Sequence, residues 1–142
     1  MNPEELRKFI QLIDKALEIA ERRKEKLKTD EYRQWRIDEA LKHASSQRQK
    51  ELLADKNIEE TLHFAFGYEA LDKFIDSLLN IKEGIQINRF EKFLAYPKGR
   101  RPHFGLTRAI SECGDSFGEG LYNEELGHAF FAIEEFFDKE LD

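Results

Sequence analysis

The sequence predicts an all-α protein, and three observations carry this prediction. Its 142 residues include no valine and three threonines, so two of the residue types that favour β-strands are nearly absent. Apolar residues recur at steps of three and four along most of the chain, which is the period of an amphipathic helix. Asparagine stands three residues before glutamate at positions 2, 57 and 88, a pattern typical of helix N-termini. We therefore expect a bundle of five to six helices.

The composition is that of a compact domain and excludes several other classes of protein. Hydrophobic residues make up 40% of the chain and aromatic residues 12%, more than a disordered protein contains. No apolar run approaches the ~20 residues of a membrane-spanning helix. The single cysteine excludes an intrachain disulfide, and the acidic N-terminus lacks the pattern of a signal peptide. The sequence predicts one cytoplasmic domain, residues 1–142, without membrane contact.

The first predicted helix covers residues 2–28. Asn2 is a suitable N-cap, Pro3 fits the first helical position, and Glu5 completes a capping box. The apolar residues that follow share one helical face: Leu6, Phe9, Ile10, Ile13, Leu17 and Ala20.

A second predicted helix begins at Thr29 or Asp30 and fades into a polar stretch near residue 50. Its apolar residues are Tyr32, Trp35, Ile37, Leu41 and Ala44. Two helices of about 25 residues would each be about 38 Å long. We expect them to form a long hairpin, residues 1–56, whose polar adjoining ends extend past the core. The apolar stripe of this hairpin could alternatively serve as the interface of a homodimer.

Residues 57–142 are predicted to form a compact, phenylalanine-rich cluster on which the hairpin packs. The Asn57 capping box opens a helix that ends near Gly84, and the Asn88 box opens a short one. A further short helix is expected at residues 107–113, and Asn123 caps the last helix. The apolar residues of that last helix lie at helical spacing: Leu126, Ala129, Phe130, Ile133, Phe136, Phe137 and Leu141.

Negative charge is concentrated at the C-terminal end, although the whole chain carries only −6. Residues 1–56 contain 14 Lys and Arg against 12 Asp and Glu, whereas residues 57–142 contain 9 against 17. Such asymmetry bears on partners, since a charged surface steers association with a surface of opposite sign. We therefore predict an interaction module that binds a basic protein, as immunity proteins and antitoxins do. The predicted partner-binding residues are Tyr122, Glu124, Glu125, Phe131, Glu134 and Glu135.

Two matching tetrapeptides offer an alternative function, a metal site. Glu60 and His63 form one Glu-x-x-His pair, and Glu125 and His128 form the other. Di-iron carboxylate bundles use two such pairs plus two further glutamates, for which Glu18 and Glu91 are available here. Such ligands suit iron or manganese. Both pairs also follow an asparagine cap closely, where acidic residues complement the helix dipole without any metal. Under that simpler interpretation the protein has no cofactor.

A basic loop before the C-terminal third is a candidate anion site. Lys98, Arg100 and Arg101 stand between Pro97 and Pro102 and could hold a phosphate. The alternatives are a solvated loop and a loop that pairs internally with the acidic C-terminal third. Nucleic acid is not an expected partner, because the sequence pI is near 5.4.

The sequence contains little that predicts catalysis. Cys113 has an acidic and a glycine neighbour, so nothing adjacent in sequence lowers the pKa of its thiol. No phosphate-binding loop or dinucleotide fingerprint is present. We therefore expect a binding protein rather than an enzyme.

Overall fold

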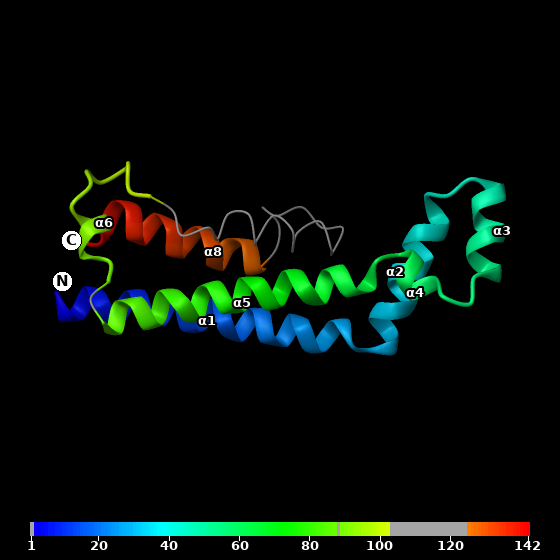
Figure 1. The fold of residues 1–142 in the computed structure, drawn as a ribbon, viewed down its shortest axis with the longest axis horizontal. Helices are drawn as coiled ribbons and strands as arrows, with labels where there is room; N and C mark the ends of the chain where they lie inside the picture. Colours follow the sequence, from blue (N-terminus) through cyan, green and yellow to red (C-terminus); the bar gives the residue numbers. More distant parts are fainter. Residues whose placement is uncertain (1, 88, 103–124) are drawn as a thin grey trace.

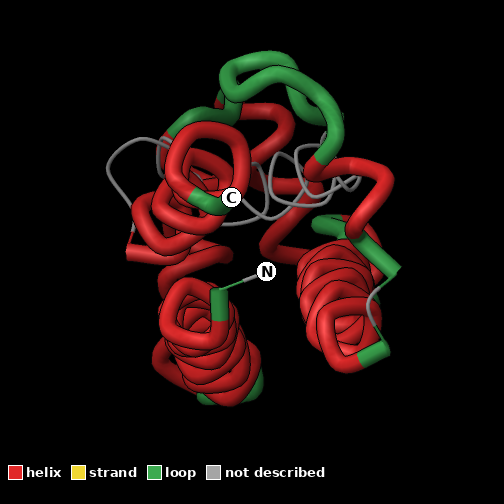
Figure 2. The backbone as a smooth tube through the Cα atoms, turned by 90° about the vertical axis from the view of Figure 1, so that its left-hand side faces the viewer, coloured by secondary structure: helices red, strands yellow, loops and turns green. Residues whose placement is uncertain are grey.

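The computed structural model describes residues 2–87, 89–102 and 125–142, and all regular structure in these residues is helical. This confirms the all-α bundle that the sequence predicts. Three helices form its body: α1 (Pro3–Leu27), α5 (Phe64–Gln86) and α8 (Glu125–Glu135). Helices α1 and α5 run side by side along the long axis, and α8 lies beside them at the end that holds both termini (Figure 1). Viewed from that end, the three helices occupy the corners of a triangle (Figure 2).

Helix α1 begins as its sequence predicts. The Asn2 side chain accepts a hydrogen bond of 2.8 Å from the backbone N–H of Glu4, and Pro3 occupies the first turn. The buried residues of α1 form one stripe: Phe9, Ile13, Ala16, Ile19, Ala20 and Leu27. This stripe faces α5 and α8, so α1 is the helix that joins the body together.

The expected N-terminal hairpin of two long helices is not what the chain forms. The second helix is divided into α2 (Asp30–Lys42) and α3 (Ser46–Ala54), and the Ser45 hydroxyl accepts a hydrogen bond of 3.2 Å from the Arg48 N–H at the new start. Helix α1 packs mainly against α5 and α8 rather than against α2. The physical reason is that α2 buries only Tyr32 and Ile37, whereas α5 offers a continuous apolar stripe.

Helices α2, α3 and α4 (Ile58–Thr61) project from the body at the end away from the termini (Figure 1). Arg36 donates a hydrogen bond of 3.1 Å to the carbonyl of Leu62, and Arg33 forms an ion pair of 2.6 Å with Glu59. These contacts tie α2 to the segment around α4. The ring of Tyr32 adds an apolar contact with Phe64, with 6.2 Å between the ring centroids, while most of the apolar core lies in the body.

The predicted capping box at Asn57 is replaced by a different arrangement. Asn57 makes no side-chain cap, and α4 is interrupted before α5 by His63, whose φ of 57° is left-handed. The Asp55 carboxylate instead accepts hydrogen bonds from the Thr61 hydroxyl at 2.6 Å and the Asn57 N–H at 2.8 Å. These two bonds hold the pKa of Asp55 below its usual value, and the bond from the Thr61 hydroxyl has the larger effect. The predicted box at Asn88, the helix at 107–113 and the cap at Asn123 lie outside the described residues.

The core joins α1, α5 and the C-terminal segment. Phe9 stacks on Phe136 and Phe137, with ring centroids 6.0 and 5.8 Å apart. The largest fully buried side chains are Phe9, Phe74, Phe130, Ile13, Leu71, Leu78, Leu126, Ile133 and Leu141. After α8 the chain continues as one π-helical turn, η2 (Phe136–Glu140), closed by a 2.8 Å bond from the Leu141 N–H to the Phe136 carbonyl. The last helix thus buries the residues that its spacing predicts, except Ala129, which is half-buried.

Gly84 sets the position of the segment that follows α5. A Cβ atom at residue 84 would lie 2.5 Å from Cζ of Phe90, so the Phe90 ring lies directly on the α5 backbone. The Arg89 N–H donates a hydrogen bond of 2.8 Å to the Gly84 carbonyl, which closes the end of α5. Phe90 is buried there and precedes the short helix α6 (Glu91–Leu94).

We expect the Gly84→Ala variant to lose about 1–2 kcal/mol of unfolding free energy. The added methyl group must displace the Phe90 ring, a cost of about 1–3 kcal/mol, while alanine returns up to about 1 kcal/mol of helix propensity. Urea denaturation measures the difference. The matched control is Gln86→Ala, at an exposed position of the same helix, which we expect to be neutral or slightly stabilising. If Gly84→Ala were as stable as the control, Phe90 would not lie against residue 84.

Candidate functional site

The strongest candidate site is a groove of about 670 Å³ between α1 and α5, which we call the acidic groove. Its lining residues are Glu18, Glu21, Arg22, Lys24, Glu25, Lys28, Asp72, Ile75 and Asp76. Five of these nine side chains are carboxylates and three are cationic, so the groove is negative overall. It is larger than a second hollow, of about 270 Å³, beside α5 and α6.

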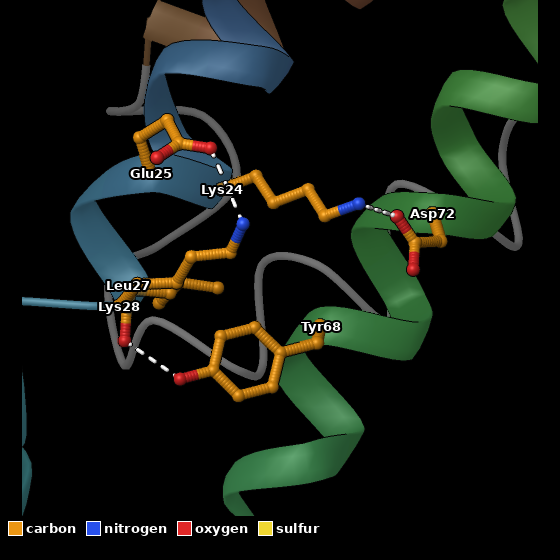
Figure 3. Close-up of polar contacts among 6 residues, drawn as sticks. All are labelled: Lys24, Glu25, Leu27, Lys28, Tyr68 and Asp72. Atoms are coloured by element: carbon orange, nitrogen blue, oxygen red, sulfur yellow. Dashed lines mark hydrogen bonds and ion pairs between the residues drawn. The ribbon is translucent and has the colours of Figure 1, made fainter.

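The groove follows from the way the two helices pack. Their apolar stripes turn toward the core, so the polar positions flanking each stripe meet at the same edge of the interface. The Lys24 ammonium donates across this edge to the Asp72 carboxylate (Figure 3). That hydrogen bond is the main reason why the pKa of Lys24 is raised. Tyr68 donates a 2.8 Å hydrogen bond to the Leu27 carbonyl and closes one end of α1.

The cations of the groove are already occupied by carboxylates of the chain. Lys24 pairs with Asp72, and Lys28 contacts Glu25 at 3.3 Å. Arg22 lies 3.8 Å from Glu18 and 3.3 Å from Glu125. Two lining carboxylates, Glu21 and Asp76, form no ion pair with any residue that the structure describes. With five carboxylates and three cations in its lining, the groove keeps an excess of negative charge, although Asp76 also acts electrostatically on Lys24.

Of the predicted partner-binding residues, the structure brings Glu125 to the groove. Its carboxylate is exposed and reaches Arg22 from the first turn of α8. Glu135 is exposed and lies 3.7 Å from Lys139 of the same helical segment. Glu134 and Phe131 are half-buried. The ring centroid of Phe131 lies 5.2 Å from that of Phe130. Tyr122 and Glu124 lie outside the described residues.

Sequence reasoning missed Glu21, Glu25, Asp72 and Asp76 as site residues. Each lies next to an apolar stripe, on the polar flank of its own helix. That signal is visible in the sequence, but it identifies a site only once α1 and α5 are known to be neighbours.

The residues of the metal hypothesis are not gathered into a centre within the described residues. Glu60 lies in α4, whereas His63 is the left-handed residue between α4 and α5, so this pair does not share one helical face. Glu125 and His128 lie at the start of α8, and Glu18 pairs with Arg22 on α1. No group of three His, Cys, Asp or Glu side chains in the described ranges is arranged to hold a metal ion. Iron or manganese binding stays a prediction without geometric support.

The basic loop contacts the C-terminal segment, one of the alternatives that its sequence leaves open. Arg101 is 4% exposed, and its guanidinium donates to the carbonyls of Phe137 at 2.6 Å, Leu94 at 3.3 Å and Leu141. Its backbone N–H donates a 2.8 Å bond to the Asp138 carboxylate.

The two neighbouring cations of this loop lie at its surface. Lys98 forms an ion pair with Asp142, which lowers the pKa of that carboxyl, chiefly through the hydrogen bond. Arg100 is exposed. The guanidinium of Arg101 thus hydrogen-bonds the protein's own backbone rather than an external anion. An anion bound at this loop would contact Lys98 and Arg100 but not Arg101.

Comparison of the chain with models of known protein families, with curated proteins and with solved structures found no match. Within the described ranges, none of the helices has both the length and the apolar character needed to cross a membrane.

Proposed function

We propose that this protein is a non-catalytic interaction module of the cytoplasm, which binds a basic segment of another protein in the acidic groove. The single observation that carries the proposal is the pair of exposed carboxylates, Glu21 and Asp76, on opposite walls of a groove whose cations are already neutralised. By analogy of size and charge, the partner would be a basic protein of the kind that immunity proteins and antitoxins neutralise.

The form of the groove favours a peptide segment over a small cation. Its length follows α1 from Glu18 to the C-cap residue Lys28, which is about three helical turns. Ile75 supplies an apolar contact between the charged walls. A segment with lysine or arginine at helical spacing could place its charges beside Glu21, Asp76 and Glu125, while its aliphatic stems cover Ile75. Charge complementarity of this kind raises the rate of association and selects the partner.

The test reverses the two unpaired charges. We expect the double variant Glu21→Lys, Asp76→Lys to bind a lysine-rich helical peptide at least about tenfold more weakly, because attraction becomes repulsion. Fluorescence anisotropy measures the affinity. Raising the salt from about 50 to about 300 mM should weaken binding to the wild-type protein as well, since exposed charges are screened. Proteins cross-linked to the wild-type groove in cells should be basic and should be lost with the double variant.

The matched control reverses two exposed acids of the projecting end, Glu31→Lys and Glu60→Lys, which form no ion pair with a described residue. This control should retain the affinity of the wild-type protein. Equal loss in both double variants would show that net charge alone attracts the peptide, and the groove would not be the site. Unchanged binding by the groove variant would also contradict the proposal.

A further inference from the structure

A second pocket, of about 270 Å³, lies between α5 and the segment that leads into α6. Its lining residues are Ser77, Asn80, Ile81, Arg89, Phe90, Lys92 and Phe93, none of which belongs to the acidic groove. No carboxylate lines it, although the chain as a whole carries −6. Its charge is therefore opposite to that of the protein around it.

One wall of this pocket is apolar and anchored to the core. Phe90 and Ile81 are buried, and Phe93 is half-buried with its ring 6.1 Å from that of Phe90. The Phe90 ring also packs edge-on against the Phe137 ring, with 6.5 Å between the ring centroids, and it lies on the α5 backbone at Gly84. Because these contacts hold the rings from behind, the wall is formed before any ligand arrives, which reduces the entropic cost of binding.

Two cations and two polar side chains stand beside this wall. The Arg89 guanidinium donates a 3.3 Å hydrogen bond to the Asn80 carbonyl, which uses one of its five donors. The Lys92 ammonium lies 5.0 Å from the centre of the Phe93 ring. Neither cation forms an ion pair with a residue in the described ranges. The remaining donors of Arg89 and Lys92, with the amide of Asn80 and the hydroxyl of Ser77, are the polar groups of the pocket.

We infer that this pocket binds a small aromatic carboxylate. The carboxylate would accept paired hydrogen bonds from Arg89 and a further one from Lys92, and the ring would lie against Phe90 and Phe93. Pockets that hold drug-sized ligands have volumes of about 300–1,000 Å³. A volume of about 270 Å³ accordingly suits one ring with its acid group. This inference uses none of the residues on which the proposed function rests.

The experiment titrates the full chain with benzoate and follows amide chemical shifts by NMR. We expect a dissociation constant on the order of 1 mM, with the largest shifts at residues lining the pocket. Two further probes distinguish the contribution of the carboxylate from that of the ring. Acetate has the charge without the ring, and benzyl alcohol has the ring without the charge. Each should bind at least about fivefold more weakly than benzoate, because each lacks one of the two contacts.

Four variants complete the test. Arg89→Gln with Lys92→Gln should weaken benzoate binding at least about fivefold, whereas Lys50→Gln with Lys56→Gln, at exposed sites of the projecting end, should leave it unchanged. Ser77→Leu should block the pocket without altering charge, and a thermal melt shows that each variant is folded. Benzyl alcohol binding as well as benzoate, no shifts at the lining residues, or full affinity in the charge variant would each overturn the inference. The groove variant Glu21→Lys, Asp76→Lys should bind benzoate normally, so the two proposals fail separately.

Discussion

Replacing Phe74 with alanine is expected to lower the free energy of unfolding by about 4 kcal/mol. The Phe74 side chain is 0% exposed and lies at the middle of α5, among the residues that join this helix to α1. Truncating a fully buried phenylalanine removes its transfer free energy and leaves a cavity, which together cost about 3–5 kcal/mol. Because small domains are stable by about 5–15 kcal/mol, this loss is a large part of the total. Urea denaturation followed by circular dichroism measures it.

Leu79→Ala is the matched control on the same helix. Leu79 is 48% exposed, so its truncation removes less buried apolar surface, and we expect a loss below about 1 kcal/mol. The contrast tests the orientation of α5 directly. Similar losses in the two variants would mean that α5 does not turn the Phe74 side toward α1.

Replacing Arg101 with alanine is expected to cost about 3 kcal/mol. The guanidinium supplies hydrogen bonds to three carbonyls, two of which belong to the end of the last helical segment. Hydrogen bonds to charged groups contribute about 1.5–3 kcal/mol each, and a buried carbonyl left without a donor costs about 1–3 kcal/mol. Part of the loss is offset because a charge no longer has to be buried. Arg101 also packs its guanidinium 5.8 Å from the centre of the Phe137 ring. Chemical denaturation measures the change in stability.

Arg100→Ala is the control for this prediction, because Arg100 is the exposed neighbour in the same loop. We expect it to change stability by less than about 0.5 kcal/mol, as surface substitutions usually do. Arg101→Lys should fall between the two, since an ammonium keeps the charge but lacks the planar fork of five donors. Hydrogen exchange of the Leu141 amide should increase in Arg101→Ala and not in Arg100→Ala. Equal stability of the two alanine variants would contradict the buried position of Arg101.

The helices that the sequence predicts best are those with a continuous apolar stripe. The N-cap of α1, part of its buried stripe (Phe9, Ile13 and Ala20) and most of the buried residues of the last helix are readable from capping and spacing, because both act within a few residues. The second predicted helix fails at Ser45, whose hydroxyl can either face solvent or cap a new helix. Local sequence favours helix on both sides of this residue and does not decide between the two.

The candidate sites were less predictable than the helices. The charge of Glu125 predicts a place in a binding surface, and the structure places it beside the acidic groove through Arg22. The other groove carboxylates cannot be singled out from the sequence, because charged residues flank almost every apolar stripe of this chain. The sequence leaves open whether Arg101 holds an anion, is solvated or pairs with the C-terminal third, because its actual partners are backbone carbonyls, which carry no signature in the sequence of side chains.

The sequence by itself determined that the chain is helical, where its main helices lie and which of their faces are apolar. These properties depend on propensity, capping and spacing, all of which act over a few neighbouring residues. Only the tertiary structure decided that α1 pairs with α5 rather than α2, that their acidic flanks enclose a groove, and that Arg101 lies beneath the C-terminal segment. Those outcomes depend on contacts between distant residues, because several apolar faces compete for one core and the best packing selects among them.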